Sequence, residues 1–263
     1  MVDLKEKLIE EIKKSGFPLE VYTSVILNKA NWFVKTNVNY FNKLVHDGRE
    51  IDIVAERKTK GIERCIDTLI IECKKSSAKS WVFFKQQKSV DVQVMNIVSP
   101  RADNYHYKWF EEKHFNDHFY TRSSVATYYM VGGVKNPQET RKDSESGPEQ
   151  VIHKAVTQVM DALVFYWNRD TDVYVKEKIS KMNFLYPIIV YDGLLFSAKI
   201  DGDNIDLTPE NHISLYVEWE LAEPMKVYYS SKGQNLRDIH QSKPFIIDVV
   251  KKEYLEEFLK NLD

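Results

Sequence analysis

Hydrophobic residues near the start of the chain recur with the period of a helix. In residues 3–15 the apolar positions fall on one side of a helix, and Gly16 follows as a stop signal. Pro18 suits the first turn of a second helix, in which apolar positions again keep helical spacing up to about Lys29. Two consecutive helices are therefore expected, with Glu20 in the first turn of the second. The apolar side of the first helix consists of Leu4, Leu8, Ile9 and Ile12.

The pattern then changes to the alternation of strands. Residues 32–41 and 49–55 alternate between apolar and polar positions, and the HDG sequence at 46–48 is a turn signal between them. A third strand is expected at about 66–74. Three consecutive strands joined by short turns predict an antiparallel meander with one covered face.

The rest of the chain mixes both periods. Asp192-Gly193, between two apolar runs, is the strongest hairpin signal. Together with the first elements, this mixture predicts an α/β or α+β protein with a mixed sheet. The remaining expected strands are 89–98, 124–131, 214–221, 225–230 and 245–250, the helices are 103–120, 148–168 and 252–262, and 135–148 is a loop.

Composition and charge set limits on function. The chain of 263 residues is 43% hydrophobic with a formal net charge of −2, so it can bury a core and any nucleic-acid surface must be local. Its two cysteines form no CxxC pair, and no phosphate-binding glycine motif occurs, so no nucleotide cofactor is expected. It lacks a signal-peptide core and an apolar run of about 18 residues, so we expect a cytoplasmic protein outside the membrane.

The third strand carries unexpected charges. In LIIECKKSS, residues 69–77, an aliphatic run leads directly into Glu72 and Lys74, which share a face because strands have a period of two. If the second and third strands pair as a meander, Asp52 lies beside Glu72. Adjacent carboxylates repel unless a cation lies between them, and such oxygen ligands suit Mg²⁺ or Mn²⁺. The sequence therefore predicts a metal site with a lysine beside it, to which Glu20 adds a further carboxylate.

Glu20 in an early helix, Asp52 in REIDIVA and Glu72-Cys73-Lys74 in LIIECKKS resemble the PD-(D/E)xK nuclease superfamily, in particular restriction-type members such as the Mrr-like nucleases. The resemblance covers roughly residues 10–90. It implies a restriction-endonuclease-like mixed sheet flanked by helices, and divalent-metal hydrolysis of phosphodiester bonds. On this interpretation residues 1–170 form the catalytic core, with an insertion at about 100–147, and residues 171–263 are a strand-rich extension packed on the same domain.

The resemblance also implies roles. Asp52 and Glu72 correspond to metal ligands, Lys74 to the catalytic lysine and Glu20 to an accessory acid that also contributes to metal binding. The proline usual before the aspartate is replaced by Ile51. Some members use a glutamine on the helix after the lysine, and Gln86 and Gln87 both lie in range.

Local charge suggests the substrate. Residues 55–88 hold nine Lys or Arg residues and four acids, an excess of five positive charges in a slightly acidic chain. Lysines and hydroxyls just after the site are able to contact phosphates without reading sequence, although a solvated lysine-rich loop has the same composition. The expected nucleic-acid-binding residues are Lys75, Ser76, Lys79, Gln86, Gln87 and Lys88.

These features together predict a Mg²⁺- or Mn²⁺-dependent endodeoxyribonuclease whose partner is DNA. A site of this kind cuts one strand, so a double-strand cutter is expected to be a homodimer. Two alternatives remain open from the sequence. One is a non-catalytic nucleic-acid-binding or assembly protein that keeps the nuclease fold, and the other is a nuclease that acts on RNA.

Overall fold

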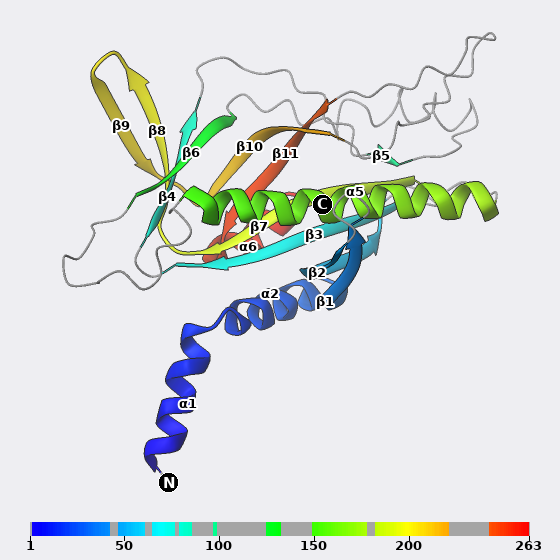
Figure 1. Cartoon of the computed structure of the whole chain (residues 1–263), viewed down its shortest axis with the longest axis horizontal. Helices are drawn as coiled ribbons and strands as arrows, with labels where there is room; N and C mark the ends of the chain where they lie inside the picture. The colour runs from blue at the N-terminus through cyan, green and yellow to red at the C-terminus, as the bar shows by residue number, and fades with distance from the viewer. Residues whose placement is uncertain are drawn as a thin grey trace.

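The computed structural model describes residues 2–42, 47–60, 65–76, 79–85, 97–98, 125–132, 149–177, 182–220 and 242–262. They form a mixed α/β structure in which a large twisted sheet lies between helices (Figure 1). The helices are α1 (Val2–Lys14), α2 (Phe17–Lys29), α5 (Glu149–Glu177), the short 3₁₀ helix η1 (Lys252–Tyr254) and α6 (Leu255–Lys260).

The sheet joins strands that are distant in the sequence. Its order is β1-β2-β3-β7-β11-β10-β6-β4-β8-β9, with β5 paired to β7. The meander β1-β2-β3 is antiparallel, as expected, whereas β7 is parallel to both β3 and β11. The strands are β1 (Phe33–Asn42), β2 (Asp47–Lys58), β3 (Cys65–Lys75), β4 (Ser80–Lys85), β5 (Ile97–Val98), β6 (Ala126–Gly132), β7 (Met182–Asp192), β8 (Leu195–Asp201), β9 (Asn204–Pro209), β10 (His212–Glu220) and β11 (Ser242–Lys251).

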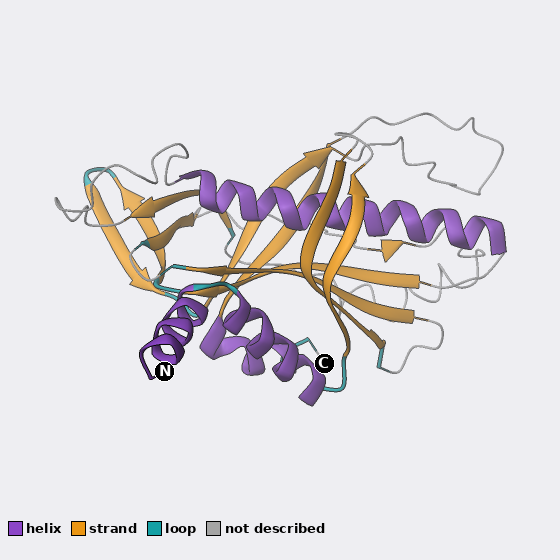
Figure 2. Cartoon of the chain, turned by 60° about the horizontal axis from the view of Figure 1, so that its bottom comes forward, coloured by secondary structure: helices purple, strands orange, loops and turns teal. Residues whose placement is uncertain are grey.

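Helices cover both faces of the central strands (Figure 2). Helix α5 packs on one face against Val54 and Ile70, while α2 and α6 pack on the other face against Ile53 and Ile71. The long helix was expected at 148–168, and the predicted apolar face of that helix is buried. That face is made of Ile152, Ala155, Val159, Ala162 and Tyr166. No helix in the described ranges is long and apolar enough to cross a membrane.

The turn predicted at residues 46–48 is displaced. Asn42 pairs with Asp47 and Phe41 with Gly48, so Asp47 and Gly48 already belong to β2. The antiparallel pairing of β1 with β2 therefore includes the Asp-Gly pair that was predicted to form the turn. The local signal was correct in kind and wrong in position.

The hairpin predicted at Asp192-Gly193 is wrong, because β7 pairs with β3 and β11 whereas β8 pairs with β4 and β9. Gly193 is needed for space: a Cβ there would lie 2.5 Å from the ring of Tyr191 and 2.8 Å from the carbonyl oxygen of Ser76. The actual hairpin joins β8 to β9, with Asp201 opposite Asn204 and Gly202 at φ +60°.

The remaining predicted strands and helices are confirmed only in part. Strand 124–131 and strand 245–250 correspond to β6 and β11, and the final helix to η1 and α6. Of the expected strand 89–98, β5 is the described part, and β4 was not predicted at all. The expected helix 103–120, loop 135–148 and strand 225–230 lie outside the described residues. Strands from both sides of position 170 belong to one sheet, since β7 pairs with β3 over eleven register positions, Cys65↔Met182 to Lys75↔Asp192.

Candidate functional site

The pairing of β2 with β3 stops next to the predicted acids. The ladder runs from Lys58↔Ile66 to Ile53↔Ile71, so the next positions on the two strands are Asp52 and Glu72. There the backbone N–H of Cys73 donates a hydrogen bond of 2.7 Å to Asp52 Oδ2. The structure therefore brings Asp52 and Glu72 to neighbouring strands, as the sequence indicated, and fixes the Asp52 carboxylate against the backbone of β3.

A backbone irregularity on the other neighbour of β2 lies at the same level. Thr36 pairs with Ile53 and Val38 with Ile51, while Asn37 between them has φ +51°. Ile51 and Ile53 then face opposite cores, although strict alternation would place them on one face. The regular alternation of β2 is therefore interrupted at Asp52, which has no partner in the pairing of β2 with β1 or with β3.

Glu72 is the most unusual residue of the site. Its side chain is 1% exposed, and Lys74 Nζ donates a hydrogen bond to Oε1. Oε2 is buried and has no hydrogen-bond partner among the described residues. Burial raises the pKa of Glu72 to about 7, against an opposing effect of Lys74 and a supporting one of Asp52. A carboxyl oxygen in this condition is costly unless a cation or a donor completes it.

Asp52 and Glu20 share this environment. Burial is the largest cause that raises the pKa of each carboxyl, and both are also raised by the nearby charge of Glu50. Asp52 raises the pKa of Glu20 directly, and Lys74 lowers it. Helix α2 thus brings Glu20 within electrostatic reach of the carboxylates on the sheet, as the sequence predicted.

Glu50 is the member of the cluster that the sequence reasoning did not assign to the site. It lies on β2 two residues before Asp52, opposite Asn39 of β1, and its side chain is exposed. The signal for it was present, because period two puts Glu50 on the same side of an ideal strand as Asp52. The cluster therefore holds four carboxylates and one lysine: Glu20, Glu50, Asp52, Glu72 and Lys74.

Of the expected nucleic-acid-binding residues, the structure describes Lys75, Ser76 and Lys79. Lys75 Nζ donates to the carbonyl oxygen of Lys13 at the end of α1, and the Ser76 hydroxyl accepts from the backbone N–H of Lys79 at 3.1 Å. The backbone carbonyl of Lys79 accepts a hydrogen bond of 2.8 Å from the Tyr191 hydroxyl, and the Lys79 side chain is exposed. Gln86, Gln87 and Lys88 lie outside the described residues.

Other cations of the basic segment are engaged inside the molecule. Arg57 lies over the ring of Trp32 at 4.1 Å and 3.4 Å from Asp67, and Lys85 lies 2.6 Å from Glu210. Part of the positive charge counted along the sequence is therefore paired with carboxylates inside the molecule. Lys58 and Lys60, at the end of β2, and Lys79, after β3, are exposed.

The fit to a divalent cation can be tested on these atoms. No group of three His, Cys, Asp or Glu side chains in the described ranges is arranged so that it could hold a metal ion. Mg²⁺ does not require one, since it retains several waters and commonly takes one or two carboxylates. Asp52 and Glu72, with raised pKa values and an unpartnered oxygen, fit that partial donor set.

Fold and site define a mixed α/β protein with an acidic cluster and a lysine where two central strands stop pairing. Comparison of the chain with protein-family models, with curated proteins and with solved structures finds no match in any of the three. The chemistry of the site is consequently argued from its own residues.

Proposed function

We propose that this protein is a divalent-metal-dependent nuclease of the PD-(D/E)xK type that hydrolyses phosphodiester bonds in DNA. The observation that carries the proposal is Glu72: a buried carboxyl with an unpartnered oxygen, in contact with Lys74 and next to Asp52 on the adjoining strand. A buried carboxyl next to a half-buried one has no evident structural benefit, because a charge costs free energy to bury.

Each side chain has a distinct task in this proposal. Asp52 and Glu72 hold Mg²⁺ or Mn²⁺, and Glu20 contributes from α2 as an accessory acid. A bound divalent cation supplies Lewis-acid stabilisation of charge on the phosphate and lowers the pKa of a coordinated water. Lys74 remains next to Glu72, from where its ammonium orients a water or stabilises the charge that develops on phosphate oxygens.

The architecture supports the same assignment at a coarser level. The resemblance implies a mixed sheet flanked by helices, and the chain has a meander, β1-β2-β3, continued in parallel by β7, with α2 and α5 on opposite faces. The site residues then come from α2, β2 and β3, which are consecutive elements except for β1. The restriction-endonuclease-like fold is part of this proposal.

One observation favours the alternative of a protein that binds nucleic acid without cutting it. Two of the cluster's carboxylates, Asp52 and Glu72, converge without a third side chain to close a metal site in the described ranges. A relic of a nuclease site would look similar. Such a protein would need no metal, and loss of a carboxylate would strengthen its binding to DNA by removing negative charge.

Plasmid cleavage tests the proposal. Supercoiled DNA, methylated and unmethylated, is incubated with the protein and Mg²⁺, Mn²⁺ or EDTA, and single-stranded RNA serves as a second substrate. We expect nicking or linearisation with either metal and none in EDTA. Lys74→Ala should lower the cleavage rate by roughly a hundredfold or more, because it removes a charge aimed at the transition state.

Lys85→Ala is the matched control for that variant. Lys85 also forms an ion pair with a glutamate, Glu210, and its side chain is 21% exposed, compared with 23% for Lys74. A wild-type rate in Lys74→Ala, or an equal loss in both variants, would refute the assignment. Binding of DNA without cleavage under all metal conditions would favour the non-catalytic alternative, and cleavage of RNA alone would change the substrate.

A further inference from the structure

Strands β6 and β10 separate shortly after they meet. Among the described residues these parallel strands share one register position, Ala126↔Leu215. On its other edge β6 pairs with β4, where Phe84 faces Tyr128 and Lys85 faces Ala126, so Thr127 is an extra residue in β6. An extra residue of this kind bends a strand and re-aims its side chains. Next to this extra residue the sheet is open between β6 and β10, because the two strands share no further register position among the described residues.

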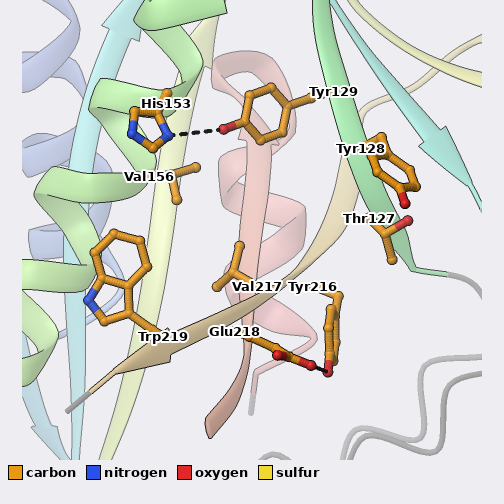
Figure 3. A pocket seen from close by; sticks show the side chains of 9 residues that line it. All are labelled: Thr127, Tyr128, Tyr129, His153, Val156, Tyr216, Val217, Glu218 and Trp219. Atoms are coloured by element: carbon orange, nitrogen blue, oxygen red, sulfur yellow. Dashed lines mark hydrogen bonds between the residues drawn. The ribbon is translucent and has the colours of Figure 1, made fainter. Parts of the chain in front are cut away.

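A cavity of about 540 Å³ occupies this opening. That volume lies within the range of small-molecule sites, roughly 300–1,000 Å³. Strands β6 and β10 and helix α5 supply the walls, and four of the nine lining side chains are aromatic (Figure 3). These four are Tyr128, Tyr129, Tyr216 and Trp219.

The aromatic walls are accompanied by polar groups of different character. The hydroxyl of Thr127 is buried and has no hydrogen-bond partner among the described residues. The Glu218 carboxylate accepts a bond of 2.9 Å from the Tyr216 hydroxyl, and the Tyr129 hydroxyl lies 3.4 Å from His153 Nδ1, as Figure 3 shows. An unpartnered hydroxyl at a bulge is costly, because the hydrogen bonds it made to water in the unfolded chain are not replaced.

We propose that this pocket binds a nucleobase. Planar heterocycles stack on tyrosine and tryptophan rings, and their edges carry both donors and acceptors. Thr127 and His153 supply groups able to act as donor or acceptor, and Glu218 is an acceptor for an exocyclic amino group. A quaternary ammonium would use the rings and Glu218 but has no hydrogen-bonding group for the Thr127 hydroxyl, and an aliphatic ligand would offer no hydrogen bond to any of the three polar groups.

The base comes either from a free nucleotide or from an unstacked position in a nucleic-acid strand. The second source rests on the proposed nuclease function, whereas the pocket itself is formed by residues outside the carboxylate cluster. Binding is therefore measured in EDTA, where metal-dependent cleavage does not occur, so the two proposals fail separately.

The test uses the full chain and a fluorescently labelled single-stranded DNA of about 12 nucleotides, followed by anisotropy. A strand of the same length with abasic sites at every interior position has the same phosphate charge but lacks the bases. We expect the wild-type protein to bind the normal strand about tenfold more tightly than the abasic strand, since one stacked base contributes roughly this factor. Nucleoside monophosphates, as competitors, reveal whether a free nucleotide also enters.

Two substitutions should remove the preference for bases. Tyr128→Ala removes an exposed ring from β6, and Trp219→Ala removes the ring on β10; each should bring binding of the normal strand close to that of the abasic strand. Phe33→Ala is the matched control, because Phe33 is 64% exposed, compared with 67% for Tyr128, and lies on β1 at the far edge of the sheet. The control should retain the tenfold preference.

A third substitution addresses recognition of the base edge. Thr127→Val keeps the shape and removes the hydroxyl, so it should reduce the differences in affinity among the four homopolymeric strands while stacking remains. Equal binding of normal and abasic strands by the wild-type protein would overturn the proposal, as would an unchanged preference in both aromatic variants. Lys74→Ala should keep the preference; its loss there would place the base at the carboxylate cluster and also overturn the proposal.

Discussion

Glu72 links the stability of the molecule to pH. Its pKa of about 7 when folded exceeds the ordinary 4.5, so between these values the folded state binds its proton more tightly than the unfolded state. The contribution is present below pH 4.5, falls as pH rises toward 7 and is absent above it. The raised pKa values of Asp52 and Glu20 act in the same direction, so a variant is needed to isolate Glu72.

Glu72→Gln should therefore flatten the decline of stability with pH. Relative to the variant, the wild-type protein without divalent metal should lose roughly 3 kcal/mol between pH 4.5 and 8, at about 1.4 kcal/mol per unit of pKa shift. Urea unfolding at a series of pH values measures the difference. Glu210→Gln, which changes a glutamate paired with Lys85, is the control and should follow the wild-type curve. A parallel course of the wild-type and Glu72→Gln curves would refute this account.

Divalent metal should offset the loss of stability that Glu72 causes at high pH. A cation bound by Asp52 and Glu72 favours their charged forms, so millimolar Mg²⁺ should raise the melting temperature at pH 8 and the rise should shrink at pH 5. Removal of the metal with EDTA should return the original value. An equal rise in Glu72→Gln would show that Mg²⁺ binds elsewhere.

At the scale of single residues, the sequence predicted that Asp52 and Glu72 lie on neighbouring strands, but not the hydrogen bonds and backbone angles that position them. Period two and a meander were enough to place Asp52 beside Glu72. Asn37 is a residue type that tolerates positive φ, but many asparagines in the chain share that property, and the bond from the Cys73 N–H to Asp52 depends on how β3 approaches β2. The partner of Lys85, Glu210, is 125 residues away and was equally invisible.

Among the elements, the link between β7 and β8 shows why a turn signal was misread. Asp192-Gly193 and Asp201-Gly202 both follow apolar strands, and local propensity treats them alike. The pairing partners of the strands decide which of the two forms a hairpin. β7 pairs with β3 and β8 pairs with β4, so the residues at 192–193 connect two strands that are not neighbours in the sheet. β4 itself was missed because its lysine and serine flanks read as a surface loop.

Two glycine substitutions test this explanation. Gly193→Ala should destabilise the protein by roughly 1–3 kcal/mol, because its Cβ would lie 2.5 Å from Tyr191. Gly48→Ala is the control: a Cβ there has nothing within 4 Å, so the change should be neutral or stabilising by up to about 1 kcal/mol. Chemical denaturation of both variants measures the difference, and an equal effect of the two would contradict a packing role for Gly193.

The terminal helices should contribute very differently to stability. The apolar residues of α1, such as Leu4 and Ile12, are exposed, whereas Leu259 and Phe258 of α6 are buried. Deletion of residues 2–14 should therefore lower the free energy of unfolding by less than about 1 kcal/mol, and Leu259→Ala by roughly 2–5 kcal/mol. Denaturation midpoints compare them, and a larger loss from the deletion would show that α1 buries its apolar side against something else.

In the whole molecule, the parallel pairing of β3 with β7 joins early and late parts of the chain. Because the central sheet needs β7 and β11, residues 1–170 alone should lack tertiary structure, although the sequence suggested a core ending there. The intact chain should unfold in one transition, with fluorescence and far-ultraviolet circular dichroism coinciding. A cooperative transition of the 1–170 fragment would show instead that the core is autonomous.

The pairing of β3 with β7 also has a consequence for folding during synthesis. β3, which carries Glu72 and Lys74, leaves the ribosome more than a hundred residues before its neighbour β7, and contacts over such separations form slowly. At roughly 5–20 residues per second, the nascent chain spends several seconds or more with β3 lacking one of its two neighbours. On the proposed function, we therefore expect the site on β3 to gain its full support only after residues 182–192 have left the ribosome.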